Sequence, residues 1–438
     1  MPSDAARPSV SGQEPARGRR IRAFLLPLIV MLCAGAILVL PMLCGRPANA
    51  SEVARALPGA PPTSAWPATG QAAIAVADGG EHASPGQGPV PTASTAKVMT
   101  AYVFLSRYPL RPGQAGPSFS VSADEAARYT ARLAASESVV PLRPGQRLTE
   151  REALQALLTA SANNVADELA RWYGSDPVAF VAEMNRTAHQ LGMDATYYTD
   201  PSGLHDTTVS TGADQVRLFQ AALRLPEFAT LAGSSYTDID GHRHANTNPM
   251  LGRDGVFAGK TGTTRAAGHN LVFAARRDST GGSRIIIGAV LHQPDTASLN
   301  TAVRRLIADS LVTAPIVRKG EVLAWAHDGW GRSIALSAEH DLSVTGPPGS
   351  SAILAIEPGT ALHNGAPAGT TPARAVVTSL RPTSARHTKG ASDASTPGEK
   401  TGPGVSVALQ TEAPLPRVPP LMWLPLRPLT WLAEAVAP

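Results

Sequence analysis

The sequence is almost free of cysteine. Only two cysteines occur in the 438 residues, Cys33 and Cys44, and both lie in one apolar stretch near the N-terminus. The rest of the chain therefore has no thiol, no disulfide and no cysteine-bound metal. The eleven histidines are scattered, and residues 242–244 (HRH), which we expect in a surface loop, lack the i,i+4 spacing of a helical metal pair. A zinc enzyme is disfavoured, and the sequence predicts no metal and no cofactor.

The chain also lacks a basic stripe that could follow a nucleic-acid backbone. Its formal net charge is +4, but residues 1–22 carry five arginines against two acidic residues. Three of the four net charges therefore lie in this leader, and the remaining chain is close to neutral. We expect no nucleic-acid partner.

The first 50 residues have the pattern of an export signal. Arginines at 17–22 are followed by an apolar run at 23–44 and by Ala-Asn-Ala at 48–50. These are the basic region, apolar region and cleavage site of a secretory signal peptide. The run is also long enough to span a bilayer as an uncleaved anchor, although Pro27 and Pro41 shorten its centre. Both alternatives, cleavage after Ala50 and a retained anchor, place the later residues outside the cytoplasm.

Four regions follow from composition and periodicity. We expect a leader at 1–50, a mixed domain of helices and strands at 51–313, a small all-β domain at 314–380, and a disordered linker with an apolar tail at 381–438. Residues 51–68, rich in Ala, Pro and Ser, are typical of a tether.

The expected fold is α/β of the α+β kind, in which helices pack on an antiparallel sheet. Thr149 and Glu152 form a capping box, so a helix should begin there, and another from about Asn164. Further helices are predicted at 92–105 and 301–312, and strands at 71–78, 256–261, 270–275, 285–291, 321–327, 332–337, 341–345, 351–356 and 374–378.

Lysine is scarce. Only five of the 38 basic residues are lysine, and between residues 51 and 313 only Lys97 and Lys260 occur. Arginine stays protonated in proteins, whereas a buried lysine can lose its proton and act as a base. We therefore interpret these two lysines as positions that arginine cannot fill.

Lys97 ends the one S-x-x-K in the sequence, which begins at Ser94. On a helix, residues i and i+3 share a face, so the Lys97 amine should reach the Ser94 hydroxyl. A serine at a helix N-terminus beside a base is an activated nucleophile. The alternative for this tetrapeptide alone is a capping serine and an exposed lysine.

Two more motifs support the nucleophile. Residues 161–163 (SAN) fall between two predicted helices, where side chains can point into a cleft. Residues 260–262 (KTG) lie on a predicted strand and are followed by Thr263 and Thr264. Gly262 would let a substrate backbone approach the strand, and Lys260 would supply positive charge. A second Lys-Thr-Gly at 400–402 lies in the predicted linker without a strand, and we interpret it as chance.

The order S-x-x-K, S-x-N, K-T-G is the motif set of β-lactamases and penicillin-binding proteins. Residues 64–380 resemble the D-alanyl-D-alanine carboxypeptidase type of low-molecular-mass penicillin-binding protein. The similar stretches are 91–100 (PTASTAKVMT), 200–204 (DPSGL), 246–248 (NTN), 259–264 (GKTGTT) and 267–268 (AG). The resemblance implies a β-lactamase/transpeptidase-like domain, with a cleft between a helical subdomain and the sheet, and a small second β domain.

The resemblance also implies site residues. Neutral Lys97 would take the proton of Ser94 as its Oγ attacks the carbonyl of the penultimate D-alanine. Ser161 would relay a proton to the leaving amine, and Asn163 would hold the substrate amide. Water would then hydrolyse the acyl-enzyme. The implied substrate is a peptidoglycan stem peptide ending in D-Ala-D-Ala, and β-lactams are the implied inhibitors.

The terminal carboxylate is the substrate's second anchor. The resemblance implies that Lys260, Thr261 and Thr263 receive it, and that the N–H groups of Ser94 and Thr263 form an oxyanion hole. One departure concerns an arginine that the family often has near the end of the strand after K-T-G. Residues 291–293 read LHQ here, so carboxylate recognition would be weaker or supplied by another arginine.

Other functions compete with the carboxypeptidase. A D,D-endopeptidase that cuts cross-links shares all three motifs, and a catalytically dead cell-wall binding module is opposed only by their completeness. A class A β-lactamase needs a glutamate four residues before an asparagine. Between Ser161 and Lys260 the glutamates are Glu168, Glu183 and Glu227, and none has an asparagine four residues later. Fast hydrolysis of β-lactams is therefore disfavoured.

The tail at 421–438 offers a second membrane contact. Trp423 and Trp431 suit the headgroup zone. Pro425 and Pro428, however, forbid a long helix. The two alternatives are that the tail lies on a membrane and that it is a short segment without such a role.

Overall fold

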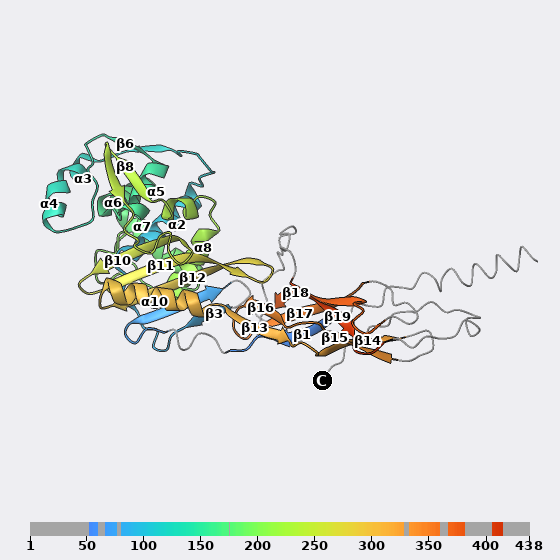
Figure 1. Cartoon of the computed structure of the whole chain (residues 1–438). Helices are drawn as coiled ribbons and strands as arrows, with labels where there is room; N and C mark the ends of the chain where they lie inside the picture. The colour runs from blue at the N-terminus through green and yellow to red at the C-terminus, as the bar shows by residue number, and fades with distance from the viewer. Residues whose placement is uncertain are drawn as a thin grey trace, which may run out of the picture.

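The computed structural model describes residues 52–59, 66–76, 80–174, 176–327, 333–359, 367–381 and 405–414. These residues form a main part of helices and sheet, from β2 to α10, and an elongated β part made of β1 and β13 to β19 (Figure 1). The predicted leader at 1–50, the Lys-Thr-Gly at 400–402 and the tail at 421–438 lie outside the described residues.

The main part is built on a five-stranded antiparallel sheet in the order β10-β11-β12-β2-β3. Its strands are β10 (Val256–Thr264), β11 (Gly268–Ser279), β12 (Gly282–Gln293), β2 (Gln71–Val76) and β3 (Gly80–Ala83). The four strands predicted in this region are confirmed. Because successive side chains of a strand point to opposite faces, Ala73 and Ala75 enter one apolar core while Ile74 and Val76 enter another.

Helices cover both faces of this sheet (Figure 1). One face packs on α10 (Thr296–Asp309), and the opposite core is filled mainly by the other helices. Those helices are η1 (Ala93–Ala96), α2 (Lys97–Arg107), α3 (Ala123–Ala127), α4 (Tyr129–Ala134), α5 (Glu150–Thr159), α6 (Asn163–Gly174), α7 (Pro177–Gln190), α8 (Gly212–Leu223) and α9 (Phe228–Ala232). The predicted α+β class is confirmed.

Short strand pairs connect the helices of the main part. They are β4 (Val90–Pro91) with β7 (Val209–Ser210), β5 (Ser118–Ser120) with β6 (Arg147–Thr149), and β8 (Tyr236–Ile239) with β9 (His242–Ala245). The surface loop predicted at 242–244 is wrong, because these residues pair with β8 in a hairpin. In the described part of the chain, no group of three His, Cys, Asp or Glu side chains is arranged to hold a metal.

Capping determines where two of the helices begin. The predicted box at Thr149 is confirmed: its side chain accepts the N–H of Glu152, and the Glu152 carboxylate accepts the N–H of Thr149. Helix α10 begins at Thr296, earlier than the predicted 301, because Asp295 accepts the N–H of Ser298 at 2.7 Å. The helix ends at Asp309, and Val312, which was predicted as its last residue, is instead the first residue of β13.

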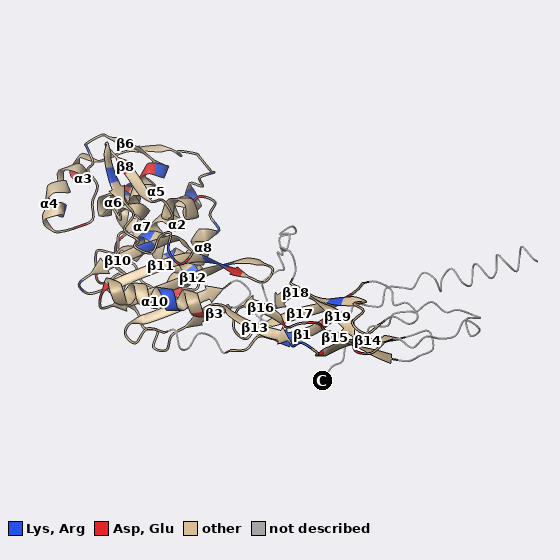
Figure 2. Cartoon of the chain, viewed as in Figure 1, with Lys and Arg blue, Asp and Glu red and all other residues tan. Residues whose placement is uncertain are grey.

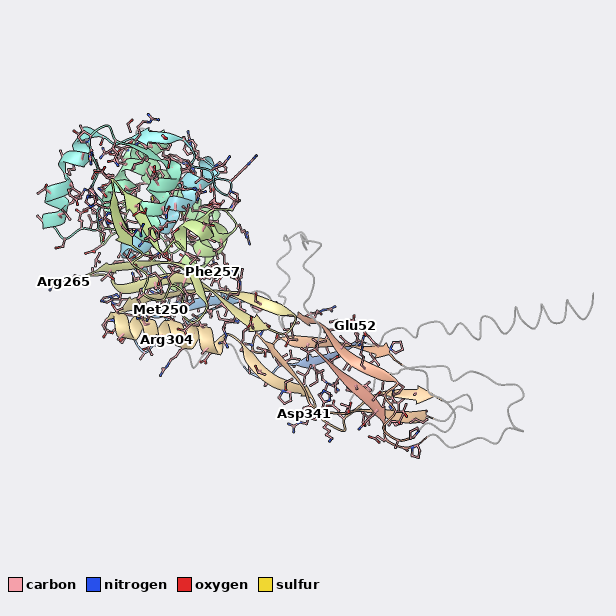
Figure 3. All side chains as sticks on the ribbon, turned by 45° about the horizontal axis from the view of Figure 1, so that its top comes forward. Glu52, Met250, Phe257, Arg265, Arg304 and Asp341 are labelled. Atoms are coloured by element: carbon pink, nitrogen blue, oxygen red, sulfur yellow. The ribbon has the colours of Figure 1, made fainter. Side chains whose placement is uncertain are left out.

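The β part contains a six-stranded antiparallel sheet in the order β1-β17-β18-β19-β15-β14 and the pair β13-β16, with one apolar core formed from both. The strands are β1 (Glu52–Ala56), β13 (Val312–Val317), β14 (Val322–His327), β15 (Ser333–Ala338), β16 (Leu342–Gly346), β17 (Ser351–Pro358), β18 (Ala373–Arg381) and β19 (Ser406–Thr411). Figure 3 marks Glu52 and Asp341 in this part and Arg304 on α10.

Two strands of this sheet correct the predicted regions. Residues 52–56 were expected in a tether but form β1, which pairs with β17. Residues 406–411 were expected in a disordered linker but form β19, which lies between β18 and β15. Both are stabilised by partners distant in sequence, which local composition does not reveal.

The two parts touch where the β11–β12 hairpin meets β16. The N–H of Thr280 donates to the carbonyl of Thr345 at 2.9 Å, and the N–H of Thr345 donates to Thr280 Oγ1 at 2.8 Å. Charged side chains of both signs are spread over both parts (Figure 2). No helix among the described residues combines the length and apolarity needed to cross a bilayer.

Candidate active site

Ser94 lies in the single turn η1, and Lys97 is the first residue of α2. The i,i+3 spacing brings Lys97 Nζ to 2.7 Å from Ser94 Oγ. Ala93 enters this turn with φ of 46°, a left-handed conformation that is strained for alanine. The strained backbone of Ala93 is part of the sharp turn that places Ser94 at the edge of a cavity.

Lys97 is completely buried, and two acceptors besides Ser94 contact its amine. Asn163 Oδ1 lies 2.7 Å from Nζ, and the carbonyl of Ser202 lies 2.9 Å from it. Burial lowers the pKa of the Lys97 amine to about 7, although the carboxylates of Asp200, Asp167 and Glu137 favour its charged form. The amine is therefore mostly neutral above pH 7, as a base for Ser94 must be.

The turn at 200–204 holds the Ser202 carbonyl in place. Asp200 accepts hydrogen bonds from Ser202 Oγ at 2.6 Å, Thr208 Oγ1 at 2.6 Å and the N–H of Leu204 at 2.9 Å. Burial acts to raise the pKa of the Asp200 carboxyl, but these hydrogen bonds lower it below its ordinary value. The ionised Asp200 carboxylate thus fixes the turn whose Ser202 carbonyl contacts Lys97.

Ser161 and Lys260 face each other across the cleft. Lys260 is completely buried, and its amine donates to Ser161 Oγ at 3.0 Å and to the Thr261 carbonyl at 2.9 Å. Ser161 has φ of 61°, so the chain between α5 and α6 is strained at this residue. Burial, reinforced by repulsion from Lys97, lowers the pKa of Lys260 well below its ordinary value. Burial thus acts against the positive charge that the sequence predicts for Lys260.

Gly262 lets strand β10 pack closely against the nucleophile turn, which is η1 together with Thr92. A Cβ at this position would lie 2.7 Å from the Thr92 carbonyl oxygen and 2.9 Å from the backbone nitrogens of Ser94 and Thr95. No side chain fits there, so the glycine permits the close packing of β10 on η1. Asn270 reinforces it, because its Nδ2 donates to the Thr92 carbonyl at 2.9 Å.

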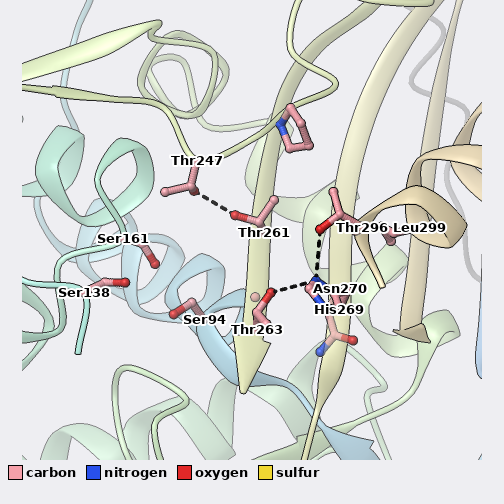
Figure 4. Close-up of a pocket in the computed structure, with 12 residues that line it drawn as sticks. Ser94, Ser138, Ser161, Thr247, Thr261, Thr263, His269, Asn270, Thr296 and Leu299 are labelled. Carbon is pink, nitrogen blue, oxygen red and sulfur yellow. Dashed lines mark hydrogen bonds between the residues drawn. The ribbon is translucent and has the colours of Figure 1, made fainter. Parts of the chain in front are cut away.

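These residues surround a cavity of about 340 Å³ (Figure 4). Five predicted site residues line it, namely Ser94, Ser161, Thr261, Gly262 and Thr263. The other three, Lys97, Asn163 and Lys260, are buried. The amines of Lys97 and Lys260 contact the lining residues Ser94 and Ser161, and Asn163 contacts Lys97. The lining also includes residues that the sequence interpretation did not name as site residues, among them Ser138, Thr247, His269, Asn270 and Thr296.

His269 is the ionisable side chain in this lining. Its Nδ1 lies 3.4 Å from Thr263 Oγ1 and 3.3 Å from Thr296 Oγ1 (Figure 4). The antiparallel register places it directly opposite Thr263, a pairing that the short turn after the third motif would have indicated. No arginine is among the described residues that line the cavity, which favours weaker carboxylate recognition over the alternative of a second arginine.

Comparison with known proteins agrees with this geometry. A family model described as D-alanyl-D-alanine carboxypeptidase, peptidase S11, matches residues 84–293. The chain is 36% identical over 205 residues to the D-alanyl-D-alanine carboxypeptidase DacB2 of Mycobacterium tuberculosis, covering 45% of this chain and 65% of that protein. It is 31% identical over 238 residues to a D-alanyl-D-alanine endopeptidase of Pseudomonas aeruginosa, covering 51% of this chain and 72% of that protein.

A solved structure is also similar. It is a D-alanyl-D-alanine carboxypeptidase from Mycobacterium tuberculosis H37Rv, 26% identical, with a TM-score of 0.47, and the match covers 57% of this chain and 91% of that one. The chain spans about two thirds of the length of the two curated relatives. Given the sequence identity to these relatives, and the three motifs that meet at one cavity, the chain belongs to the D-alanyl-D-alanine carboxypeptidase family.

Proposed function

We propose that this chain is a serine-type D-Ala-D-Ala carboxypeptidase that removes the terminal D-alanine from peptidoglycan stem pentapeptides. The observation that carries the proposal is the 2.7 Å contact between the buried Lys97 amine and Ser94 Oγ at the edge of a cavity. A buried amine with a pKa of about 7 can take a hydroxyl proton at neutral pH, which arginine cannot do.

The reaction then proceeds in two steps. Ser94 Oγ attacks the carbonyl carbon of the penultimate D-alanine while its proton passes to Lys97. The C–N bond breaks as the proton held by Lys97 passes through Ser161, whose Oγ accepts from Lys260, to the leaving amine, and Lys97 becomes neutral again. Water then adds to the acyl-enzyme carbonyl and gives a proton to Lys97. The C–Oγ bond breaks, and this proton returns to Ser94 Oγ to restore the hydroxyl. The backbone N–H groups of Ser94 and Thr263 are the proposed oxyanion donors, each worth about 3 kcal/mol in comparable enzymes.

The terminal carboxylate is proposed to bind beside β10. Thr261, Thr263 and His269 line this end of the cavity and can donate hydrogen bonds. An arriving carboxylate would favour the charged form of Lys260, because an opposite charge nearby offsets the cost of burial. Substrate binding would therefore favour the positive charge of Lys260, against the effect of its burial.

The direct test is to incubate the 51–438 chain with a stem pentapeptide ending in D-Ala-D-Ala and to measure free D-alanine. We expect release of one D-alanine per peptide, and none from the Ser94→Ala variant. Absence of release by the wild-type chain would contradict the proposal.

A D,D-endopeptidase is the second candidate, because relatives from Haemophilus influenzae, Pseudomonas aeruginosa and Escherichia coli carry that name. A cross-linked peptide dimer should be cleaved more slowly than the pentapeptide if the carboxypeptidase is the main activity. Faster cleavage of the dimer would favour the endopeptidase.

We also propose that the enzyme works outside the cytoplasm, associated with the membrane or the cell-wall space. Support comes from the export pattern at 17–50 and from the tryptophan-containing tail at 421–438. Cell fractionation of the full chain and of a chain ending at residue 415 separates the two contributions. A full chain that stays in the cytoplasm contradicts the proposal.

A further inference from the structure

The amide of Asn163 has neighbours that decide which way it points. Its Nδ2 donates to a Glu137 carboxylate oxygen at 3.0 Å, while its Oδ1 lies 2.7 Å from Lys97 Nζ. A carboxylate only accepts hydrogen bonds, an amide NH₂ only donates and an amide oxygen only accepts. The flipped amide would bring two acceptors together at Glu137, so Glu137 fixes Oδ1 toward Lys97.

This orientation determines the direction of the Lys97 lone pair. A neutral amine has two N–H groups and one lone pair. The Asn163 Oδ1 and the Ser202 carbonyl, at 2.7 and 2.9 Å, can only accept, so they take the two N–H groups. The lone pair is left facing Ser94 Oγ, which is the arrangement that proton abstraction requires.

Glu137 is itself held in place. Arg132, on α4, donates to it at 2.7 Å and also pairs with Asp167 on α6. The side chains of Arg132 and Glu137 are only 11% and 13% exposed, so this ion pair is poorly screened. The Ser138 carbonyl accepts the N–H of Asn163 at 2.7 Å, which joins the Glu137 segment to the start of α6.

We propose that Glu137 is a positioning residue for acyl transfer: it orients the amide of Asn163, which directs the lone pair of Lys97 at Ser94. The proposal rests on the roles of Ser94 and Lys97 in the proposed function. It gives Asn163 a second task besides holding the substrate amide, and no sequence motif marks Glu137.

A pH profile separates this role from simple structural support. The charged groups that act on Lys97 are Asp200, Asp167, Glu137 and Lys260. The three carboxylates favour the charged amine, so removing the charge of Glu137 lowers the pKa of Lys97 below about 7. The acid limb of the rate profile should then move to lower pH even as the maximum rate falls. If the substitution only exposed the site to water, the pKa of Lys97 would rise and the acid limb would move to higher pH.

The experiment measures the second-order rate constant for acylation of Ser94 by benzylpenicillin, from about pH 5 to about pH 9, on the 51–438 chain. Glu137→Ala removes the acceptor of the Asn163 Nδ2–H together with the charge, and it should lower the plateau about tenfold and move the acid limb to lower pH. The control Asp124→Asn removes an exposed carboxylate from the neighbouring helix α3 and should change neither. In an Asn163→Ala background, Glu137→Ala should change the plateau less than about twofold, because it acts through Asn163.

Each outcome is decisive. An unchanged plateau and limb in Glu137→Ala overturns the positioning role, as does a lower plateau with the limb unmoved or moved to higher pH. A full additional loss in the Asn163→Ala background also overturns it. Thermal unfolding verifies that each variant is folded, and Glu137→Leu provides the same comparison if Glu137→Ala does not fold. A wild-type chain that benzylpenicillin does not acylate rejects the proposed function itself, which distinguishes the two failures.

Discussion

At the scale of single residues, the two buried lysines differ in what they must do. In the proposed mechanism Lys97 must lose a proton, whereas Lys260 donates to Ser161 Oγ and is proposed to act on the substrate carboxylate. Both are 0% exposed, and burial lowers the pKa of each. The scarcity of lysine in an arginine-rich chain was therefore an informative signal.

Replacement of Lys97 by arginine should abolish most activity although charge is retained. Arginine cannot accept the Ser94 proton, so Lys97→Arg should lower kcat/KM for D-alanine release at least about 10³-fold. Lys260→Arg should lose less, because arginine can still donate hydrogen bonds and carry charge. Equal losses in the two variants would contradict this division of roles.

The wild-type pH profile should reflect Lys97. Its pKa is about 7 and the active form is neutral, so kcat/KM should fall as pH decreases below about 7 and level off above it. Steady-state kinetics on the pentapeptide measures this limb. A profile that stays flat down to pH 5 would exclude Lys97 as the base.

His269 should contribute to recognition of the carboxylate. When Nδ1 accepts from the hydroxyls of Thr263 or Thr296, Nε2 carries the proton and can donate to a carboxylate. His269→Gln should reduce the preference for a free C-terminal acid over the C-terminal amide about tenfold. His292→Gln is the matched control, because His292 does not line the cavity. An unchanged preference in His269→Gln would exclude this role.

Sequence spacing predicted the residues whose partners are local or belong to a motif. Ser94 and Lys97 are three residues apart, so helical geometry alone brings them together. His269 and Glu137 were missed for a different reason. The first depends on the register of two strands, and the second on a loop that returns to the start of α6.

At the scale of elements, the site depends on how closely β10 packs on η1. Gly262→Ala would place a Cβ 2.7 to 2.9 Å from three backbone atoms of the nucleophile turn, none of which belongs to a flexible side chain. We expect about 1–3 kcal/mol lower stability in urea unfolding. Acylation of Ser94 should slow at least about tenfold, because β10 must shift away from the nucleophile.

The control for this prediction is Gly88→Ala, where an added Cβ meets nothing within 4 Å. It should leave both stability and acylation near the wild-type values. A Gly262→Ala variant that acylates at the wild-type rate would show that the close packing is not needed.

Element prediction succeeded where the local signal was strong. The capping box at Thr149 and the apolar strands of the central sheet were apparent from the sequence. The strands β1 and β19 were not predicted, although Val407 and Leu409 alternate toward the core as a strand requires. Their Pro-, Ser- and Ala-rich surroundings outweighed that pattern, and their partners lie far away in sequence.

At the scale of the whole molecule, the chain has separate apolar cores in the main part and the β part. Leu57 follows β1 and is only 2% exposed in the β-part core, although it precedes the whole main part in sequence. A substitution that destabilises one part should therefore leave the other part folded.

Leu57→Ala should destabilise the β part by about 2–5 kcal/mol while leaving acylation of Ser94 unchanged at 25 °C. In calorimetry, the unfolding transition of the β part should occur at a lower temperature than in the wild type. Benzylpenicillin labelling should proceed at the wild-type rate. Leu158→Ala, in a core of the main part, is the matched comparison and should slow labelling. Slower labelling in Leu57→Ala would mean that the two parts unfold together.

The central claim is that Ser94 forms an acyl-enzyme with the help of Lys97, and one measurement tests it most directly. Intact-mass spectrometry of the 51–438 chain after incubation with benzylpenicillin should show a single adduct, and peptide mapping should place it on Ser94. The Ser94→Ala variant should show none. An adduct that persists in Ser94→Ala, or one mapped to another residue, would contradict the account.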